Sequence, residues 1–304
     1  MPLLLFFLLA SFWGFSFVAI KYVVMALPPI TGASYRVMLA LATLTIIYVV
    51  TKKPFGFSSP QRRAMWLCGF FFQALPFALL FWGERLVSPG LAGIFNGTTP
   101  LWTFALALIF LRKHESFTAR KCAGLMIGFA GVAIIFYPKM AFQGTHQEFL
   151  GVLAIFGMAV CYAIGNILNR RIIVKNSDPS LYSNLYQQHV ASCIILIIFS
   201  LALEGWHEWS NIPRILSSGS AQVALLYLSI CSNAIAWLIY FYLMHKWDAI
   251  RASAVAYLVP LVAVAGDFML FQNIPAVTDI LGMAVVLCGV ALIQLKSRRK
   301  KGAY

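Results

Sequence analysis

Charged residues are scarce in this sequence of 304 residues. Asp, Glu, Lys and Arg together make up 11% of the chain, and only nine residues are acidic. A soluble domain carries about 25% charged residues, which cover its water-facing surface. Because hydrophobic residues make up 61% of this chain, its composition excludes an ordinary soluble domain and predicts an all-α, polytopic membrane protein.

The motifs of common enzymes and of ATP-driven pumps are also missing. The sequence has no Gly-x-Ser-x-Gly, no His-Glu-x-x-His, no phosphate-binding loop and no close pair of acids within an apolar run. We therefore expect a protein that is not an enzyme and that needs no cofactor and no metal ion. A pump driven by bound ATP is excluded within this chain for the same reason.

Cysteine pairs are absent as well. The six cysteines all fall inside apolar runs, and none forms a Cys-x-x-Cys pair. We interpret them as small core residues with no disulfide or metal role. They are Cys68, Cys122, Cys161, Cys193, Cys231 and Cys288.

Long apolar runs are abundant, and about twenty such residues span the hydrocarbon core of a membrane. The first run has no basic segment before it and no small-residue cleavage site after it, so we interpret it as a helix and not as a signal peptide. Ten predicted helices cover residues 3–26, 31–51, 64–83, 90–111, 119–137, 149–171, 180–203, 220–244, 251–271 and 276–295.

The basic residues predict the orientation of these helices. With the N-terminus inside, the cytoplasmic segments hold 18 of the 23 Lys and Arg residues and the outer loops hold three. This bias predicts that both termini are cytoplasmic. It also explains the net charge of +14 without a nucleic-acid partner.

Two segments of the chain repeat each other. The segments 124–135 and 282–293 share five of twelve residues, including a Gly-x6-Gly spacing followed by Val-Ala. A Pro-Leu step precedes each segment, at Pro100 and at Pro260. We therefore predict two five-helix repeats, residues 1–137 and 149–296, followed by a basic cytoplasmic tail at 297–304.

An odd number of helices per repeat means that the second half enters the membrane from the opposite side. The two halves are then inverted, which is typical of secondary transporters with a substrate site between the repeats near the midplane. Some channels are also inverted repeats, so a channel-like or scaffold protein stays open as an alternative.

Specific residues resemble a known family. The paired Pro-Leu and Gly-x6-Gly signatures, Trp13–Gly14, Lys21 and Arg36 are similar to the EamA domain of the drug/metabolite transporter superfamily. The acid of the Glu115–Thr118 loop is similar to that family's loop before the fifth helix, whereas the second half has no acid at 272–275. The resemblance implies ten helices around a central cavity in a bacterial inner membrane. It is strongest to the YddG-type exporters of aromatic and other amino acids.

Ionisable residues within the membrane are costly and are expected to have a function or a partner. Lys21 and Arg36 lie toward the outer side and are candidates to attract a carboxylate or to gate the outer mouth. The alternatives are snorkelling to the interface or pairing with Glu84, Glu148 or a backbone carbonyl. Two further candidates for gating or coupling are Asp267, which an interfacial position would also explain, and His189, which could equally be a hydrogen-bonded structural group.

Polar and aromatic residues on the predicted helices are candidates for substrate binding. Amides can line a wet path or join neighbouring helices by hydrogen bonds. Aromatic rings can stack against a flat substrate or can pack in the core. The candidates are Trp13, Gln73, Asn96, Trp102, Tyr162, Asn166, Asn233, Trp237 and Tyr257.

Small residues and prolines predict how the helices meet. Small residues at regular spacing let two helices approach closely, so we expect the glycine faces of the fifth and tenth helices to pack together. Pro100 and Pro260 are candidates for a hinge or a static kink. The glycines are Gly124, Gly128, Gly131, Gly282 and Gly289.

The sequence therefore favours a secondary transporter that exports small metabolites, among them aromatic amino acids, by alternating access. Multidrug efflux and the transport of phosphorylated solutes are alternatives. The expected partners are a small-molecule substrate and the lipid bilayer. A monomer is favoured, and a dimer stays open.

Overall fold

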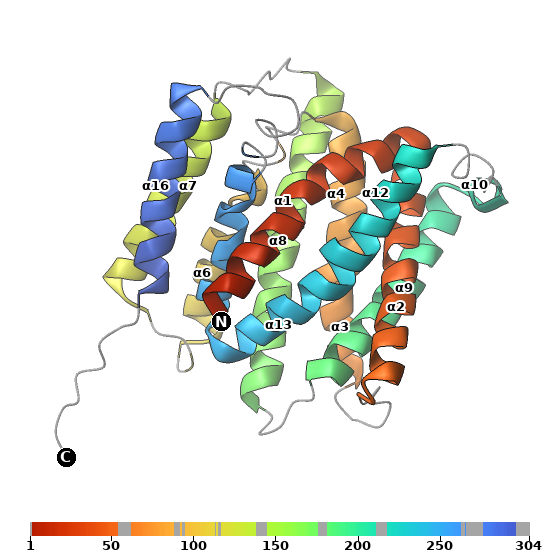
Figure 1. The fold of residues 1–304 in the computed structure, drawn as a ribbon, viewed down its shortest axis with the longest axis horizontal. Coiled ribbons are helices and arrows are strands. Elements are labelled where there is room, and N and C mark those ends of the chain that lie inside the picture. Colours follow the sequence, from red (N-terminus) through yellow and green to blue (C-terminus); the bar gives the residue numbers. More distant parts are fainter. Residues whose placement is uncertain are drawn as a thin grey trace.

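The structure is a computed structural model. It describes residues 2–53, 62–87, 92, 95–112, 114, 117–137, 145–175, 181–210, 218–262, 265 and 276–295. Asp267 and the basic tail at 297–304 lie outside these described residues. Within them every regular element is a helix, which confirms the all-α class (Figure 1).

The helices follow one another along the whole chain. Most are apolar over their full length because their outward side chains face lipid and not water. In chain order they are α1 (Pro2–Ala26), α2 (Pro29–Val50), α3 (Arg62–Gly69), η1 (Phe70–Ala74), α4 (Leu75–Leu86), α6 (Thr99–Phe110), α7 (Ala119–Phe136), α8 (His146–Lys175), α9 (Leu181–Leu203), α10 (His207–Ser210), α12 (Gly219–Ser229), η3 (Ile230–Ile235), α13 (Ala236–Lys246), α14 (Ala249–Ser253), η4 (Ala254–Tyr257) and α16 (Val277–Gln294).

Seven helices among the described residues are long and apolar enough to cross a membrane, and two shorter apolar helices cover Thr99–Phe110 and Ala249–Val262. Large apolar side chains such as Met25, Val50 and Ile109 are exposed on the outside of the bundle. In a bilayer these side chains meet lipid, so their exposure carries no cost. The count of ten spans stays a prediction.

Two of the long spans change their helical winding near the middle. The span from Arg62 to Leu86 contains the π-helical segment η1, and the span from Gly219 to Lys246 contains the π-helical segment η3. A π turn holds one residue more than an α turn, so it changes which side chains share a face. These segments lie beside the central cavity.

Helices α7 and α16 form a close pair at one side of the molecule (Figure 1). A Cβ atom added at Gly289 would lie 2.4 Å from the backbone nitrogen of Gly128, and one added at Gly131 would lie 2.6 Å from the backbone nitrogen of Val286. Only glycine permits this approach of the two backbones. The glycine faces that the sequence predicted to pack together therefore do meet. We call this contact the α7–α16 seam.

The two proline positions differ in their surroundings. Pro100 lies in the first turn of α6, where the missing N–H breaks no helical hydrogen bond. Pro260 follows the 3-10 turn η4, so the chain changes winding just before it. A hinge role of either proline stays a prediction.

An ion pair joins α7 to the start of α14. The ammonium of Lys121 lies 2.6 Å from Oδ2 of Asp248. The other oxygen of Asp248 accepts a hydrogen bond from the backbone N–H of Arg251 at 2.8 Å, which caps the N-terminus of α14. This end of the α7–α16 seam is thereby tied to the helices that line the cavity.

Candidate functional site

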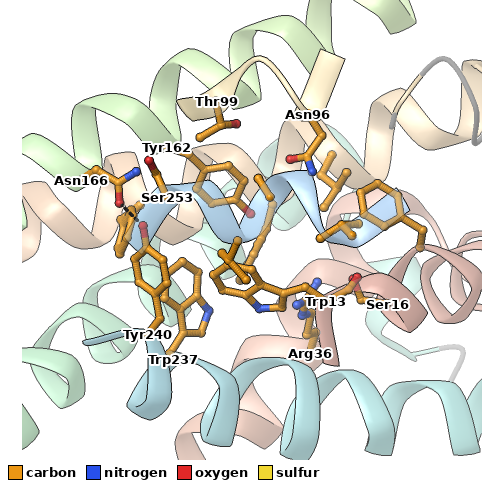
Figure 2. A pocket seen from close by; sticks show the side chains of 17 residues that line it. Trp13, Ser16, Arg36, Asn96, Thr99, Tyr162, Asn166, Trp237, Tyr240 and Ser253 are labelled. Carbon is orange, nitrogen blue, oxygen red and sulfur yellow. Dashed lines mark hydrogen bonds between the residues drawn. The ribbon is translucent and has the colours of Figure 1, made fainter. Parts of the chain in front are cut away.

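A cavity of about 70 Å³, counted as the space open to the centre of a water molecule, lies within the bundle. Its walls come from both halves of the chain, and most of the side chains that line it are aromatic or apolar (Figure 2). The lining residues are Trp13, Ser16, Phe17, Arg36, Phe72, Phe77, Leu80, Asn96, Thr99, Tyr162, Asn166, Trp237, Tyr240, Ser253, Val255, Ala256 and Val259.

Aromatic rings make up one wall of the cavity. The ring of Trp237 lies 4.6 Å from that of Phe72 and 5.3 Å from that of Trp13, measured between centroids. Tyr162 and Tyr240 extend the same cluster, at 6.4 Å and 5.6 Å from Trp237. Rings at these spacings bury much apolar surface, and they offer flat faces and edges to a flat ligand.

Arg36 of α2 brings a positive charge to this cavity. Its side chain is 2% exposed, and its guanidinium carbon lies 4.3 Å from the centroid of the Phe77 ring. Nη2 donates hydrogen bonds to Ser232, to the backbone oxygen at 3.3 Å and to Oγ at 3.1 Å. Nε and Nη1 have no hydrogen-bond partner among the described residues. Unpaired guanidinium donors in a buried cavity favour an anionic ligand.

Asn166 and Tyr240 lie at the end of the cavity away from Arg36 in the view of Figure 2. The hydroxyl of Tyr240 donates to Oδ1 of Asn166 at 2.7 Å, and Nδ2 of Asn166 donates to Thr103 at 3.1 Å. Asn166 is therefore largely paired within the protein. By contrast, Oγ1 of Thr99 and Nε1 of Trp237 have no hydrogen-bond partner in the described part of the chain. These two atoms can bond a ligand without breaking an existing contact.

The structure brings six of the predicted site residues into the lining of the cavity. They are contributed by helices from both halves of the sequence. They are Trp13, Arg36, Asn96, Tyr162, Asn166 and Trp237.

Other predicted residues do not line this cavity. Trp102 packs its ring against Phe156 at 5.4 Å. Tyr257 packs against Gly128, and its hydroxyl donates a hydrogen bond to the backbone oxygen of Leu125 at 2.9 Å. Lys21 donates to the backbone oxygen of Glu84 at 3.3 Å.

Three more predicted residues, Gln73, His189 and Asn233, lie in one buried network beside the cavity. Each has little or no exposed surface. His189 is hydrogen-bonded to both amides, at 3.2 Å to Gln73 and 3.1 Å to Asn233. The network joins three helical elements, and none of its side chains is part of the lining.

Sequence reasoning missed several lining residues. Phe72 is one of three consecutive phenylalanines, and the π turn η1 decides which of them faces the cavity. Ser253, Val255 and Ala256 lie in or beside the 3-10 turn η4, where α-helical spacing does not predict the exposed face. Irregular winding therefore removed the periodic signal that could have revealed these residues.

Glu84 is a further residue whose surroundings the sequence did not predict. From the sequence it is a candidate only as a partner of Lys21 or Arg36. Its side chain is 4% exposed, and Oε1 has no hydrogen-bond partner among the described residues. Lys21 reaches its backbone oxygen, and no ion pair of its carboxylate with either cation occurs in the structure.

No metal centre emerges from the part of the chain that the structure describes. In those residues no group of three or more His, Cys, Asp or Glu side chains could hold a metal ion. The chemical groups in the cavity are one guanidinium, aromatic rings, amides and hydroxyls. Such groups can bind and release a solute, so the site has the character of a binding cavity.

Comparison with known proteins connects this chain to transport. A model of the EamA-like transporter family matches residues 1–137 and again residues 149–295. The chain is 27% identical to an "Uncharacterized transporter" of Archaeoglobus fulgidus over 294 residues, which cover 95% of this chain and 97% of that protein. It is 24% identical to a "Probable amino-acid metabolite efflux pump" of Escherichia coli over 280 residues, which cover 91% and 89%.

One crystal structure also has the same fold. It matches over 98% of each chain with a TM-score of 0.78 and 18% sequence identity. At this identity the match concerns the arrangement of the helices alone.

Proposed function

Because this chain belongs to the EamA-like transporter family and is a multi-pass membrane protein, we propose that it exports small metabolites by alternating access. The proposed substrates include amino acids with aromatic or large apolar side chains. The proposed location is a bacterial inner membrane, with both termini cytoplasmic. The transporter works as a monomer without a cofactor, and its partners are the solute and the lipid bilayer.

A single observation carries the choice of substrate. Nε and Nη1 of Arg36 are unpaired in a buried cavity whose wall is built from Trp13, Phe72 and Trp237. A substrate carboxylate bonds to the guanidinium, and a flat side chain lies against the aromatic rings. Two relatives are named amino-acid metabolite efflux pumps, and this supports the same class of solute.

Transport into proteoliposomes tests this proposal. Purified protein is reconstituted with unlabelled phenylalanine inside, and uptake of labelled phenylalanine is measured in counterflow without ATP. We expect saturable uptake that 3-phenylpropanoate inhibits, because it keeps the ring and the carboxylate. 2-Phenylethylamine lacks the carboxylate, so we expect it to inhibit at least about tenfold more weakly.

The outcomes separate the alternatives. Equal inhibition by 2-phenylethylamine would contradict the role of Arg36, and absence of counterflow for a panel of amino acids would contradict the substrate class. Flux that does not saturate would favour a channel. Phosphorylated solutes are the less favoured substrates because Arg36 is the one Lys or Arg among the lining residues that the structure describes.

Coupling to protons is tested in the same vesicles. We favour uniport, since no described lining residue is a carboxylate or a histidine. Uptake should then be equal with and without a pH gradient of one unit. A clear acceleration by an inward proton gradient would overturn uniport while leaving the substrate class intact.

A further inference from the structure

The two π-helical segments occur at corresponding places in the chain. The family model matches the chain twice, and each match contains one long span with a π segment in its middle, η1 in the first and η3 in the second. π turns are rare, and they are found mostly as single turns at functional positions of α-helices. Their presence in both halves suggests a shared task.

One π segment lines the cavity, and the other holds two of its lining residues in place. Phe72 of η1 lies in the aromatic wall, 4.6 Å from the ring of Trp237. Ser232 of η3 accepts hydrogen bonds from Arg36 Nη2 and, at 3.2 Å, from Nε1 of Trp13. The position of the wall and the position of the positive charge thus both depend on a π turn.

The next residue in each segment turns away from the cavity and meets His189 of α9. Gln73 follows Phe72, and its Nε2 lies 3.2 Å from Nδ1 of His189. Asn233 follows Ser232, and its Oδ1 lies 3.1 Å from Nε2 of His189. All three side chains are 0% exposed. One imidazole ring therefore bridges the two π segments.

A neutral imidazole has one donor and one acceptor nitrogen, and both of its tautomers can bridge the two amides. With its proton on Nε2, His189 donates to Oδ1 of Asn233 and accepts from Nε2 of Gln73 at Nδ1. With its proton on Nδ1, it donates to the backbone oxygen of Leu185, 3.0 Å away, and both amides contact the ring in their flipped orientation.

We propose that His189 is a positioning residue that couples the two π segments and thereby sets the affinity of the cavity for its solute without touching it. A displacement of η1 shifts Gln73, the imidazole transmits the shift, and Asn233 carries it to Ser232 and Arg36. Because residues in one hydrogen-bond network are energetically coupled, the effects of changing Gln73 and Asn233 should not add. The affinity part of this proposal rests on the proposed function, whereas the coupling part does not.

Amide hydrogen exchange of the purified, solute-free protein tests the coupling. We expect Gln73→Leu to raise exchange at least about threefold in peptides covering η3, to which Gln73 makes no direct hydrogen bond among the described residues. In the His189→Leu background, Gln73→Leu should cause no further change in η3. Ser192→Ala is the matched control, because Ser192 is also buried on α9 and bonds only to the backbone oxygens of Gly69 and Gln188.

Transport kinetics test the effect on affinity. His189→Leu, Gln73→Leu and Asn233→Leu should each raise the KM for phenylalanine about fivefold, and the double variant of Gln73 and Asn233 should raise it no further. The maximal rate per folded protein should stay within about twofold, which a general loss of structure would not allow.

Each outcome has a defined meaning. Unchanged exchange in η3 after Gln73→Leu, or additive effects of the two amide substitutions, would overturn the proposed bridge. An unchanged KM in His189→Leu would overturn the effect on affinity. If the wild-type protein transports no phenylalanine at all, the proposed substrate fails, and hydrogen exchange still decides the coupling.

Discussion

The α7–α16 seam and the central cavity of the same bundle differ in how closely they are packed and in which atoms they bury. At the seam two backbones touch through glycines, and the atoms nearest to Gly124, Gly131 and Gly289 are backbone atoms and apolar side chains. In the cavity Arg36, Thr99 and Trp237 hold buried polar atoms without partners among the described residues. Buried unpaired groups cost stability. The cavity therefore lowers the free energy of unfolding, whereas the close packing at the seam raises it.

The comparison teaches where to expect each kind of mutational effect. A substitution at the seam should change folding and leave the chemistry of the cavity alone. A substitution that removes the unpaired charge of Arg36 should change transport and leave stability equal or higher, as is common at functional sites. Three predictions test this separation, beginning with the largest expected effect.

Gly289→Ala should be the most damaging change. Its Cβ would lie 2.4 Å from the backbone nitrogen of Gly128, and backbone atoms cannot move aside cheaply. We expect a loss of about 3 kcal/mol in the free energy of unfolding, or failure to accumulate folded protein. Thermal unfolding in detergent measures it.

Gly157→Ala provides the matched control on α8. Its Cβ would meet only Cδ1 of Leu79, at an ordinary distance of 3.5 Å. Because alanine favours helix over glycine, this variant should be equal to or more stable than wild type by up to about 1 kcal/mol. If Gly289→Ala and Gly157→Ala changed the free energy of unfolding by similar amounts, the close approach of the two backbones at the seam would not explain the effect.

Arg36→Met should abolish most transport without unfolding the protein. It removes the unpaired guanidinium donors and a buried charge while keeping an apolar side chain against Phe77. We expect phenylalanine transport to fall by at least about tenfold and the melting temperature to stay equal or rise. Flux and thermal unfolding are measured on the same preparation.

Arg36→Lys sharpens this prediction. It keeps the charge but loses the planar fork that can hold a carboxylate with two hydrogen bonds. Transport should be intermediate between wild type and the methionine variant. The opposite result is a lower melting temperature for Arg36→Met together with wild-type transport by the protein that is folded. It would show that Arg36 stabilises the fold and does not bind the solute.

Trp237→Leu should have the smallest effect of the three, and a selective one. It removes the ring that lies 4.6 Å from Phe72 and 5.3 Å from Trp13. Aromatic pairs contribute about 0.5–1.5 kcal/mol beyond area burial, so the KM for phenylalanine should rise about fivefold relative to that for leucine. Trp102→Leu, outside the cavity lining, should leave this ratio unchanged.

The amino-acid sequence by itself determined the class of the protein and the face by which α7 meets α16. Long apolar runs and scarce charge require helices in a bilayer, and regular α-helical winding keeps glycines at fixed spacing on one side. The spacing of Gly131 and Gly289 in the sequence therefore predicted a contact that the folded protein makes. The prediction of an all-α membrane protein is confirmed, and its ten spans and inverted halves stay predictions.

Only the tertiary structure decided which residues form the cavity. The π turns shift the helical register, so that Phe72 faces the cavity while Gln73 faces His189. Tyr257 lies on a 3-10 turn and packs against Gly128, although its type and place suggested a substrate contact. The cavity wall combines regular helices with irregular turns, and these elements are distant in sequence. No local pattern encodes their meeting, because it depends on how the whole bundle packs.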